Sequence, residues 1–294
     1  MIDVIQKFVT YLQKTKKTST NTIISYERDL KKMLRYFETQ NIHEVFQVTG
    51  IGLTSYVMYL EKENFATSTI SRNIASIRAF FHWLEGKKLI DNDPSQELKP
   101  PKVIKKAPEI LTVEEVNRLL LQPREDTAKG IRDRCMMEIL YATGIRVSEL
   151  VNLQTTDANL QMEYIRCGQD GRERIIPFGS LCRKSLKKYM EDSRTELLGK
   201  NECKELFINC SGKSMSRQGF WKVLKSYSSE AHITKDITPH TLRHSFAAHL
   251  IQNGADVKSV QEMLGHSDIS STQMYLNLGN QKMREVYSKS HPRK

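Results

Sequence analysis

The sequence predicts a mainly α-helical protein with two domains and one small β-sheet, and three observations predict it. Apolar residues recur at helical spacing through most of residues 1–95. Residues 91–108 hold four prolines and four lysines, which disfavour a helix and favour an extended basic linker. Beyond residue 109 the helical pattern returns, with a few short stretches that are typical of strands.

Residues 1–95 are expected to form four helices. Three of them have an apolar stripe, whose members are Ile2, Ile5, Phe8, Val9 and Leu12 in the first helix, Tyr26, Leu30, Met33 and Phe37 in the second, and Ile70, Ile74, Ile77, Phe81 and Leu84 in the fourth. We expect the second helix to begin near residues 18–21 and the third near Thr54. The fourth is expected to be capped by Thr67 or Ser68 and to end before Gly86.

After the linker, local signals mark further helices and a hairpin. Thr112 and Glu115 have the spacing of a capping box at the start of a helix, and Gly144 is expected to close the helix that follows. Residues 164–178 are expected to form a β-hairpin, with Gly-Gln-Asp-Gly as its turn. Residues 205–209 are a candidate strand, and the pattern beyond Ser216 is helical again.

The composition limits the class of protein. A formal net charge of +11, from 45 basic and 34 acidic side chains, is typical of a protein with a polyanionic partner, although a merely basic soluble protein has the same charge. Five cysteines without a CxxC pair argue against disulfides and a zinc site and favour a reducing cytosol. No stretch reaches transmembrane length and the N-terminus has no apolar signal segment, so we expect a cytoplasmic protein without a membrane partner.

Five residues occur in an order that suits attack on a phosphodiester: Arg146, His240, Arg243, His266 and Tyr275. Arginine forks hold two phosphate oxygens and offset charge in the transition state. A histidine can take the phenol proton, so that the phenolate attacks phosphorus. Each residue also has an ordinary explanation.

Arg146 alone would be a surface arginine paired with Glu149. Tyr275 is one of eleven tyrosines and could pack in the core, and His266 could cap a helix. His240 and His244 have a spacing that zinc sites use, but the metalloprotease motif needs glutamate where Thr241 stands. The combination of all five in one order favours the catalytic interpretation.

The strings that carry these residues are ATGIRVSEL, HTLRHSFAAHL and LGHSDISSTQMY, and together they resemble the tyrosine recombinase (phage integrase) family. The resemblance covers nearly the whole chain and is strongest to the bacterial Xer recombinases. It implies a four-helix, SAM-like core-DNA-binding domain in residues 1–95 and a linker in residues 96–108. It also implies an α/β catalytic domain in residues 109–294, whose C-terminal helix docks on a neighbouring protomer.

The resemblance also implies a role for each residue. Tyr275 would be the nucleophile that forms a 3′-phosphotyrosine, and Arg146, Arg243 and His266 would bind the scissile phosphate. His240 would be a general acid/base, with Glu149 supporting the site. Relatives of this type use no metal and no cofactor.

One position departs from the family pattern. The hairpin normally carries a lysine in a string like GKGxKER, where it protonates the leaving 5′-hydroxyl, and Gln169 stands at that position here. Glutamine has no titratable proton to give. The alternative function is therefore a DNA-binding relative with weak or no cleavage activity.

The resemblance implies double-stranded DNA as the partner, bound by a homotetramer of two dimers or by a heterotetramer with a paralogous recombinase. The role would be resolution of chromosome or plasmid dimers, with nucleoid association, or integration and excision of a mobile element. Candidate DNA contacts are Ser71, Arg72, Lys102, Lys105, Lys106 and Arg172. Ser71 and Arg72 could equally be solvated residues of a helix face.

Overall fold

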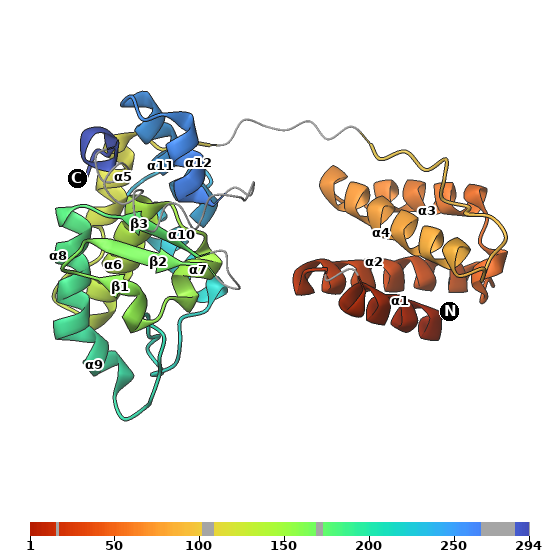
Figure 1. The fold of residues 1–294 in the computed structure, drawn as a ribbon, viewed down its shortest axis with the longest axis horizontal. Helices are drawn as coiled ribbons and strands as arrows, with labels where there is room; N and C mark the ends of the chain where they lie inside the picture. The colour runs from red at the N-terminus through yellow and green to blue at the C-terminus, as the bar shows by residue number, and fades with distance from the viewer. Residues whose placement is uncertain (16–17, 102–108, 169–172, 266–285, 294) are drawn as a thin grey trace. The chain divides into compact units, whose positions relative to one another are not determined.

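The computed structural model describes residues 1–15, 18–101, 109–168, 173–265 and 286–293. The chain divides into two compact units, Met1–Lys106 and Ala107–Lys294, which are drawn in Figure 1. No helix within the described ranges is both long and apolar enough to cross a membrane.

The N-terminal unit is a four-helix domain. Its helices are α1 (Ile2–Lys14), α2 (Thr20–Thr39), α3 (Gly50–Lys62) and α4 (Thr67–Gly86), with a short 3-10 helix at Val45–Gln47. The predicted stripes are confirmed as core, since all their members are buried except Ile2, which is 60% exposed, and Tyr26, which is partly buried. Apolar spacing therefore located the core of this unit.

The predicted helix starts are less accurate. Ser19 caps α2, as expected, by accepting a hydrogen bond from the backbone N–H of Thr22 at 3.3 Å. The third helix begins at Gly50, earlier than predicted, because the Thr49 hydroxyl caps the backbone N–H of Gly52 at 3.1 Å. The cap predicted for α4 is wrong, since that helix follows Ala66 without any side-chain cap.

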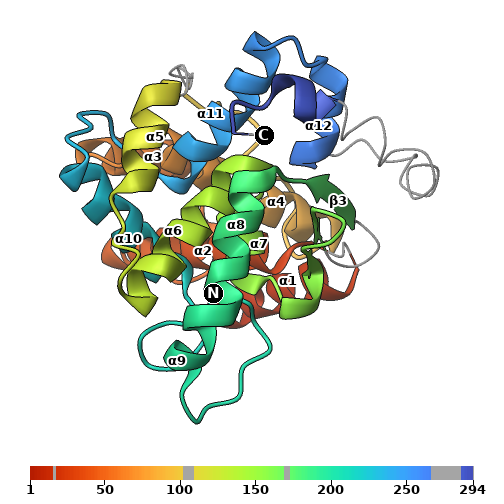
Figure 2. The same cartoon turned by 90° about the vertical axis from the view of Figure 1, so that its left-hand side faces the viewer.

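The C-terminal unit is mostly helical and is built around α6. Its helices are α5 (Val113–Leu121), α6 (Ala128–Thr143), α7 (Val147–Asn152), α8 (Ser180–Lys188), α9 (Arg194–Leu198), α10 (Arg217–Glu230), α11 (Pro239–Gln252) and α12 (Val257–Leu264), with a 3-10 turn at Thr155–Asp157 and a π-helical turn at Tyr189–Ser193. Nearly every residue of α6 is buried, because α5, α8 and α11 pack around it (Figures 1 and 2).

Local signals in this unit are confirmed. The backbone N–H of Thr112 donates to Glu115 Oε2 at 2.7 Å and that of Glu115 donates to Thr112 Oγ1 at 3.2 Å, so the capping box is present. Gly144 closes α6 with φ of +60°, and a Cβ there would lie 2.3 Å from the Phe246 ring. Both the backbone angle and the close packing therefore require glycine.

A small antiparallel sheet lies beside the helices, in the order β1 (Ala158–Asn159), β2 (Tyr164–Cys167) and β3 (Arg174–Pro177). The predicted antiparallel pairing of two strands is confirmed, with Cys167 opposite Arg174, whereas residues 169–171 of the predicted turn lie outside the described residues. No pattern in the sequence predicted β1. Residues 205–209 form no strand of the sheet, because they make only isolated bridges, Gln154 to Glu205 and Ile208 to Ser214.

The last described residues, 286–293, pack on the unit's own core. The backbone N–H of Gly179 donates to the Tyr287 hydroxyl at 3.2 Å, and the His291 ring stacks on the Tyr287 ring with centroids 4.6 Å apart. The Arg293 guanidinium makes an ion pair with Glu138. This part of the chain therefore lies against the α6 side of its own unit.

Candidate active site

Arg146 lies between two helices, just after the end of α6. It is the residue before α7, and its backbone N–H donates to Glu149 Oε2 at 2.6 Å. One guanidinium nitrogen donates to the Gly265 carbonyl at 3.1 Å and another lies 3.5 Å from Glu149 Oε1. These two partners orient the guanidinium group. The side chain is nevertheless 42% exposed to solvent, so a ligand can reach it.

Arg243 projects from α11 into the same place and is buried, at 6% exposure. Its Nη1 donates to the Gly144 carbonyl at 2.5 Å and its Nη2 to the Leu264 carbonyl at 2.7 Å. Because α11 begins at Pro239 with Thr238 as its cap, His240 and Arg243 stand one turn apart near the start of this helix. The helix start that the sequence predicted is confirmed.

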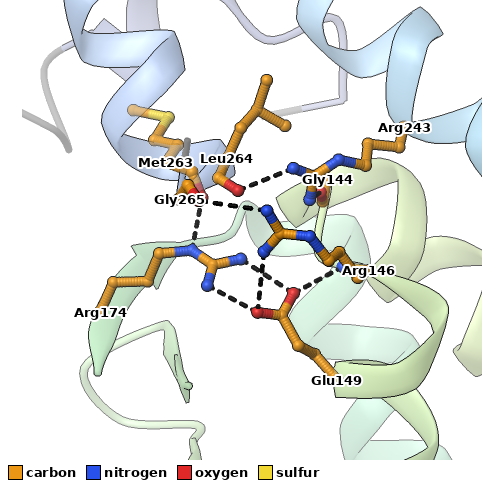
Figure 3. A network of polar contacts seen from close by, with 8 residues as sticks. All are labelled: Gly144, Arg146, Glu149, Arg174, Arg243, Met263, Leu264 and Gly265. Atoms are coloured by element: carbon orange, nitrogen blue, oxygen red, sulfur yellow. Dashed lines mark hydrogen bonds and ion pairs between the residues drawn. The ribbon is translucent and has the colours of Figure 1, made fainter. Parts of the chain in front are cut away.

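A third arginine, Arg174, completes the cluster, and sequence reasoning did not identify it as a site residue. Its Nη1 and Nη2 donate to the two oxygens of Glu149 at 2.7 and 2.9 Å, and its Nε donates to the Met263 carbonyl at 2.8 Å. Figure 3 shows the three guanidinium groups gathered beside Met263, Leu264 and Gly265. The only sequence signal for a role of Arg174 was its charge at the start of a predicted strand.

Backbone carbonyls make this gathering of like charges possible. Met263 and Leu264 are the last residues of α12, Gly265 follows them, and Gly144 follows the last residue of α6. Carbonyl groups at a helix C-terminus lack partners within the helix and carry partial negative charge. All three arginines donate to carbonyls of these two helix ends, which therefore offset part of the repulsion between them.

The arginine cluster contains one carboxylate, that of Glu149, and three guanidinium groups. Burial opposes ionisation of Glu149, but the hydrogen bonds and charges of Arg174 and Arg146 outweigh it and lower the pKa of this carboxyl. Burial, together with the charges of Arg146 and Arg174, lowers the pKa of Arg243 to about 10. Arginine side chains are positively charged in proteins, so three of them against one carboxylate leave an excess of positive charge that suits an anionic ligand.

A hollow of about 450 Å³ opens beside this cluster. Arg146, Arg166, Ser148, Glu149 and Glu173 line it, together with Cys167. Burial raises the pKa of the Cys167 thiol to about 12, so the thiol is not ionised at neutral pH. The lining is polar and mixed in charge, and Arg146 is the only member of the arginine cluster among its lining residues.

His240 is exposed at the start of α11, and its ring centroid lies 6.5 Å from that of His244. Burial, followed by the neighbouring His240 and Arg243, lowers the pKa of His244. His249 is buried, and its Nδ1 lies 2.8 Å from the Tyr141 hydroxyl, in agreement with the structural role expected for it. His240 and His244 are both exposed on this helix, and His240 is the one that stands a turn before the buried Arg243.

Comparison with known proteins identifies the family. The model of the phage integrase family matches residues 109–282, and that of the phage integrase N-terminal SAM-like domain matches residues 5–88. The chain belongs to the phage integrase family. The tyrosine recombinase XerD of Halalkalibacterium halodurans is 42% identical over 291 residues, which cover 98% of this chain and 97% of that protein. The XerD of Staphylococcus saprophyticus is 41% identical, with both chains covered completely.

These matches define the class within the family. The chain is a tyrosine recombinase of the XerC/XerD type, and this is a class of DNA strand transferases. The predicted fold is confirmed as well, since a SAM-like helical domain precedes a mostly helical domain with a small sheet.

Solved structures show the same fold. The crystal structure of XerA recombinase has 26% sequence identity and a TM-score of 0.51, and the match covers 99% of both chains. The pre-cleavage complex of XerH with its difH substrate has 20% identity and a TM-score of 0.69, and the match covers 97% of this chain and 82% of that one.

Of the residues that the sequence predicted for catalysis, the structure brings Arg146 and Arg243 together. Seven other predicted site residues lie outside the described residues: His266, Tyr275, Gln169, Arg172, Lys102, Lys105 and Lys106. His266 directly follows Gly265, whose carbonyl binds Arg146.

The predicted DNA contacts in the N-terminal unit have defined surroundings. Arg72 Nε and Nη2 each donate to one oxygen of Asp29 at 2.8 Å, and the Arg72 side chain remains 43% exposed whereas that of Asp29 is buried. Asn73 and Tyr56 extend this network beneath the surface. The Ser71 hydroxyl is buried and has no partner among the described residues.

One group of side chains in the described ranges has the spacing of a cation site. His82, Glu85 and Asp93 offer ligand atoms within 4.8 Å of one another. Both carboxylates accept hydrogen bonds from the backbone: Glu85 from the N–H of Asp93 at 3.2 Å, and Asp93 from the N–H of Ser95 at 2.7 Å. These contacts explain the grouping as a turn that follows α4.

Proposed function

We propose that this recombinase cleaves and rejoins double-stranded DNA at specific sites through a 3′-phosphotyrosine on Tyr275. The observation that supports the proposal best is the cluster of Arg146, Arg174 and Arg243 around the single carboxylate of Glu149. A cluster with excess positive charge and one half-exposed arginine fork suits a phosphodiester.

The proposed chemistry follows from the groups available. The Tyr275 hydroxyl gives its proton to His240 and attacks phosphorus. The bond to the 5′ oxygen breaks, and this oxygen takes a proton from solvent and leaves as a 5′-hydroxyl. Arg146, Arg243 and His266 hold the phosphate oxygens and offset the added negative charge. The strand's 3′-phosphate stays on Tyr275 until a 5′-hydroxyl reverses the step, so no metal or cofactor is needed.

Covalent trapping tests the proposal. The purified protein is incubated with nicked fragments of DNA from its own genome in chelator and then quenched with detergent. The wild type is expected to form a protein–DNA adduct and Tyr275→Phe is expected to form none, whereas Tyr11→Phe is the matched control in the other unit. An adduct that persists in Tyr275→Phe contradicts the assignment of the nucleophile.

A second candidate function is that of a DNA-binding relative that assembles on sites without cutting them, and Gln169 is the observation that favours it. Loss of a positioned general acid costs roughly 10²–10⁴-fold in rate. Under this candidate the wild type binds DNA in a salt-sensitive way, and Gln169→Lys restores the adduct.

A modified substrate shows whether the leaving group limits cleavage. Sulfur in place of the 5′ bridging oxygen gives a thiolate that leaves without a proton donor, since thiols have pKa values of about 8.5. If Gln169 limits the reaction, this substrate accelerates the wild type much more than Gln169→Lys. Equal acceleration of the two proteins shows that residue 169 does not determine how the leaving group is protonated, and no acceleration of either shows that this protonation is not limiting.

We further propose that cleavage takes place in a tetrameric synapse of two dimers, made from this chain alone or with a paralogous recombinase. The support is the resemblance of the whole chain to Xer recombinases. Native mass spectrometry of the protein on DNA with two trapped sites is expected to find four protomers. A complex that never contains more than two protomers on this DNA contradicts the tetrameric assembly.

A further inference from the structure

Arg174 contacts both of the groups that hold Arg146. It binds the Glu149 carboxylate at 2.7 and 2.9 Å, and Glu149 in turn accepts the backbone N–H of Arg146 at 2.6 Å. It also lies against Gly265, where an added Cβ would come within 2.9 Å of Arg174 Nη1. The Gly265 carbonyl is the second partner of the Arg146 guanidinium.

The two arginines differ in what they present to a ligand. The Arg146 side chain is 42% exposed, whereas that of Arg174 is 14% exposed. Arg174 uses its Nε, Nη1 and Nη2 on protein oxygens. Its position therefore suits a residue that orients neighbours, and that of Arg146 suits a residue that meets a phosphate.

The contacts of Arg174 also join three separate parts of the chain. Arg174 is the first residue of β3, Glu149 belongs to α7, and Met263 lies at the end of α12. Gly265 has a left-handed backbone, with φ of +64°, and it leads directly into His266. A bidentate guanidinium with a third bond fixes both distance and angle, which a single ammonium group does not.

We propose that Arg174 is a positioning residue for strand cleavage, which orients the Arg146 fork through Glu149 and through Gly265. The inference rests on the proposed function, since Arg146 must meet the scissile phosphate. It assigns Arg174 no contact with the substrate. A misplacement of about 1 Å in a catalytic group can cost about 100-fold in rate, so a support of this kind has a measurable effect.

The first test compares Arg174→Lys with Arg194→Lys. Arg194 is a matched control, because it also donates to backbone carbonyls, those of Leu206, Cys203 and Glu205, outside the arginine cluster. At saturating nicked DNA, Arg174→Lys is expected to slow adduct formation about 10–100-fold, with a Kd for DNA within about threefold of the wild type. Arg194→Lys is expected to keep the wild-type rate.

A neutral substrate separates positioning from a general defect. With methylphosphonate at the scissile position, the phosphate lacks the negative charge that Arg146 would offset. The rate penalty of Arg174→Lys is therefore expected to shrink to about threefold or less on this substrate. An equal penalty on both substrates, or no penalty on either, overturns the proposal.

The second test does not depend on cleavage. In the free protein, the Nε–H signal of Arg146 is assigned with Arg146→Lys, and its heteronuclear relaxation is measured. The signal is expected to report an ordered side chain in the wild type and Arg194→Lys, and a mobile one in Arg174→Lys. Unchanged order in Arg174→Lys overturns the proposal.

The rate measurement and the relaxation measurement distinguish failure of the proposed strand cleavage from failure of the proposed role of Arg174. If the wild type forms no adduct, strand cleavage fails as the function, while the relaxation of Arg146 still decides the role of Arg174. If Arg174→Lys does not fold by circular dichroism, Arg174→Gln takes its place, because it keeps an amide donor for Glu149 without a buried charge. The same outcomes then apply.

Discussion

Arg174 and Glu149 form a two-bonded ion pair, with Nη1 to Oε1 at 2.7 Å and Nη2 to Oε2 at 2.9 Å, and both side chains are largely buried. Glu149 lies three residues after Arg146 and Arg174 lies across the sheet hairpin from Cys167. The pair therefore ties the hairpin to the helix that follows Arg146.

This ion pair makes stability depend on pH in a defined direction. Burial opposes charge on Glu149, but Arg174 and Arg146 lower the pKa of its carboxyl in the folded protein. A lowered folded pKa contributes stability above the unfolded pKa of about 4.3, and this contribution is lost as pH falls through the folded pKa. We expect Glu149→Gln to destabilise the C-terminal unit at pH 7, and the difference from wild type to shrink below about pH 4.5.

The measurement needs a probe of this unit alone. The chain has two tryptophans, Trp83 and Trp221. In a Trp83→Phe background, Trp221 fluorescence reports urea unfolding of the C-terminal unit. A difference between Glu149→Gln and wild type that grows as pH falls contradicts the prediction.

An oxyanion is expected to stabilise the arginine cluster. The lowered pKa of Arg243 means that its positive charge is partly uncompensated, so inorganic phosphate at the site offsets a cost of folding. At ten times its Kd, a ligand adds about 1.4 kcal/mol, which corresponds to a rise in Tm of about 3–6 °C. Arg146→Gln is expected to remove most of this rise, measured against sodium chloride at equal ionic strength. Equal rises in both proteins indicate a bulk salt effect.

Gly144→Ala is expected to destabilise the C-terminal unit by about 2–5 kcal/mol. Two costs add, the left-handed backbone at φ of +60° and the collision of a Cβ with the Phe246 ring. Gly254→Ala is the matched control, because Gly254 has φ of +88° but no atom within 4 Å of an added Cβ. The control is expected to lose only about 1–2 kcal/mol in urea unfolding. Equal losses at the two positions rule out the collision with Phe246.

In the N-terminal unit, Arg72→Gln is expected to weaken DNA binding and to reduce the salt dependence of log Kd by about one ion. The buried Asp29 carboxylate holds one edge of the Arg72 guanidinium, and the side chain remains 43% exposed. Titrations at several salt concentrations measure the slope. Lys87→Gln, at the exposed end of the same helix, is the control for lost charge. Equal slopes for Arg72→Gln and wild type exclude a phosphate contact.

The features that the sequence predicted well are those that nearby residues specify. The Thr112 capping box, the left-handed Gly144 and the proline at the start of α11 each depend on a few adjacent residues. Apolar spacing found the helix stripes for the same reason. The cap of α4 was misplaced because that helix follows Ala66 without a side-chain cap, although Thr67 and Ser68 were available.

What the sequence could not predict depends on distant partners. The role of Arg174 needs a carbonyl 89 residues away, and the orientation of Arg72 needs a carboxylate 43 residues away. Neither relationship has a spacing that could be read along the chain. Arg146 and Arg243 were found because the strings around them resemble a family, since no local rule relates two residues that meet across the fold.

The end of α12 has a consequence for how this site can vary. Arg174 and Arg243 bind Met263 and Leu264 through main-chain oxygens, which every amino acid supplies. The side chains at these two positions can therefore change in type, provided that they still fill the core, without altering what the arginines bind. In an alignment of relatives, such positions would be variable in sequence and constant in function, and a search for invariant residues would overlook them.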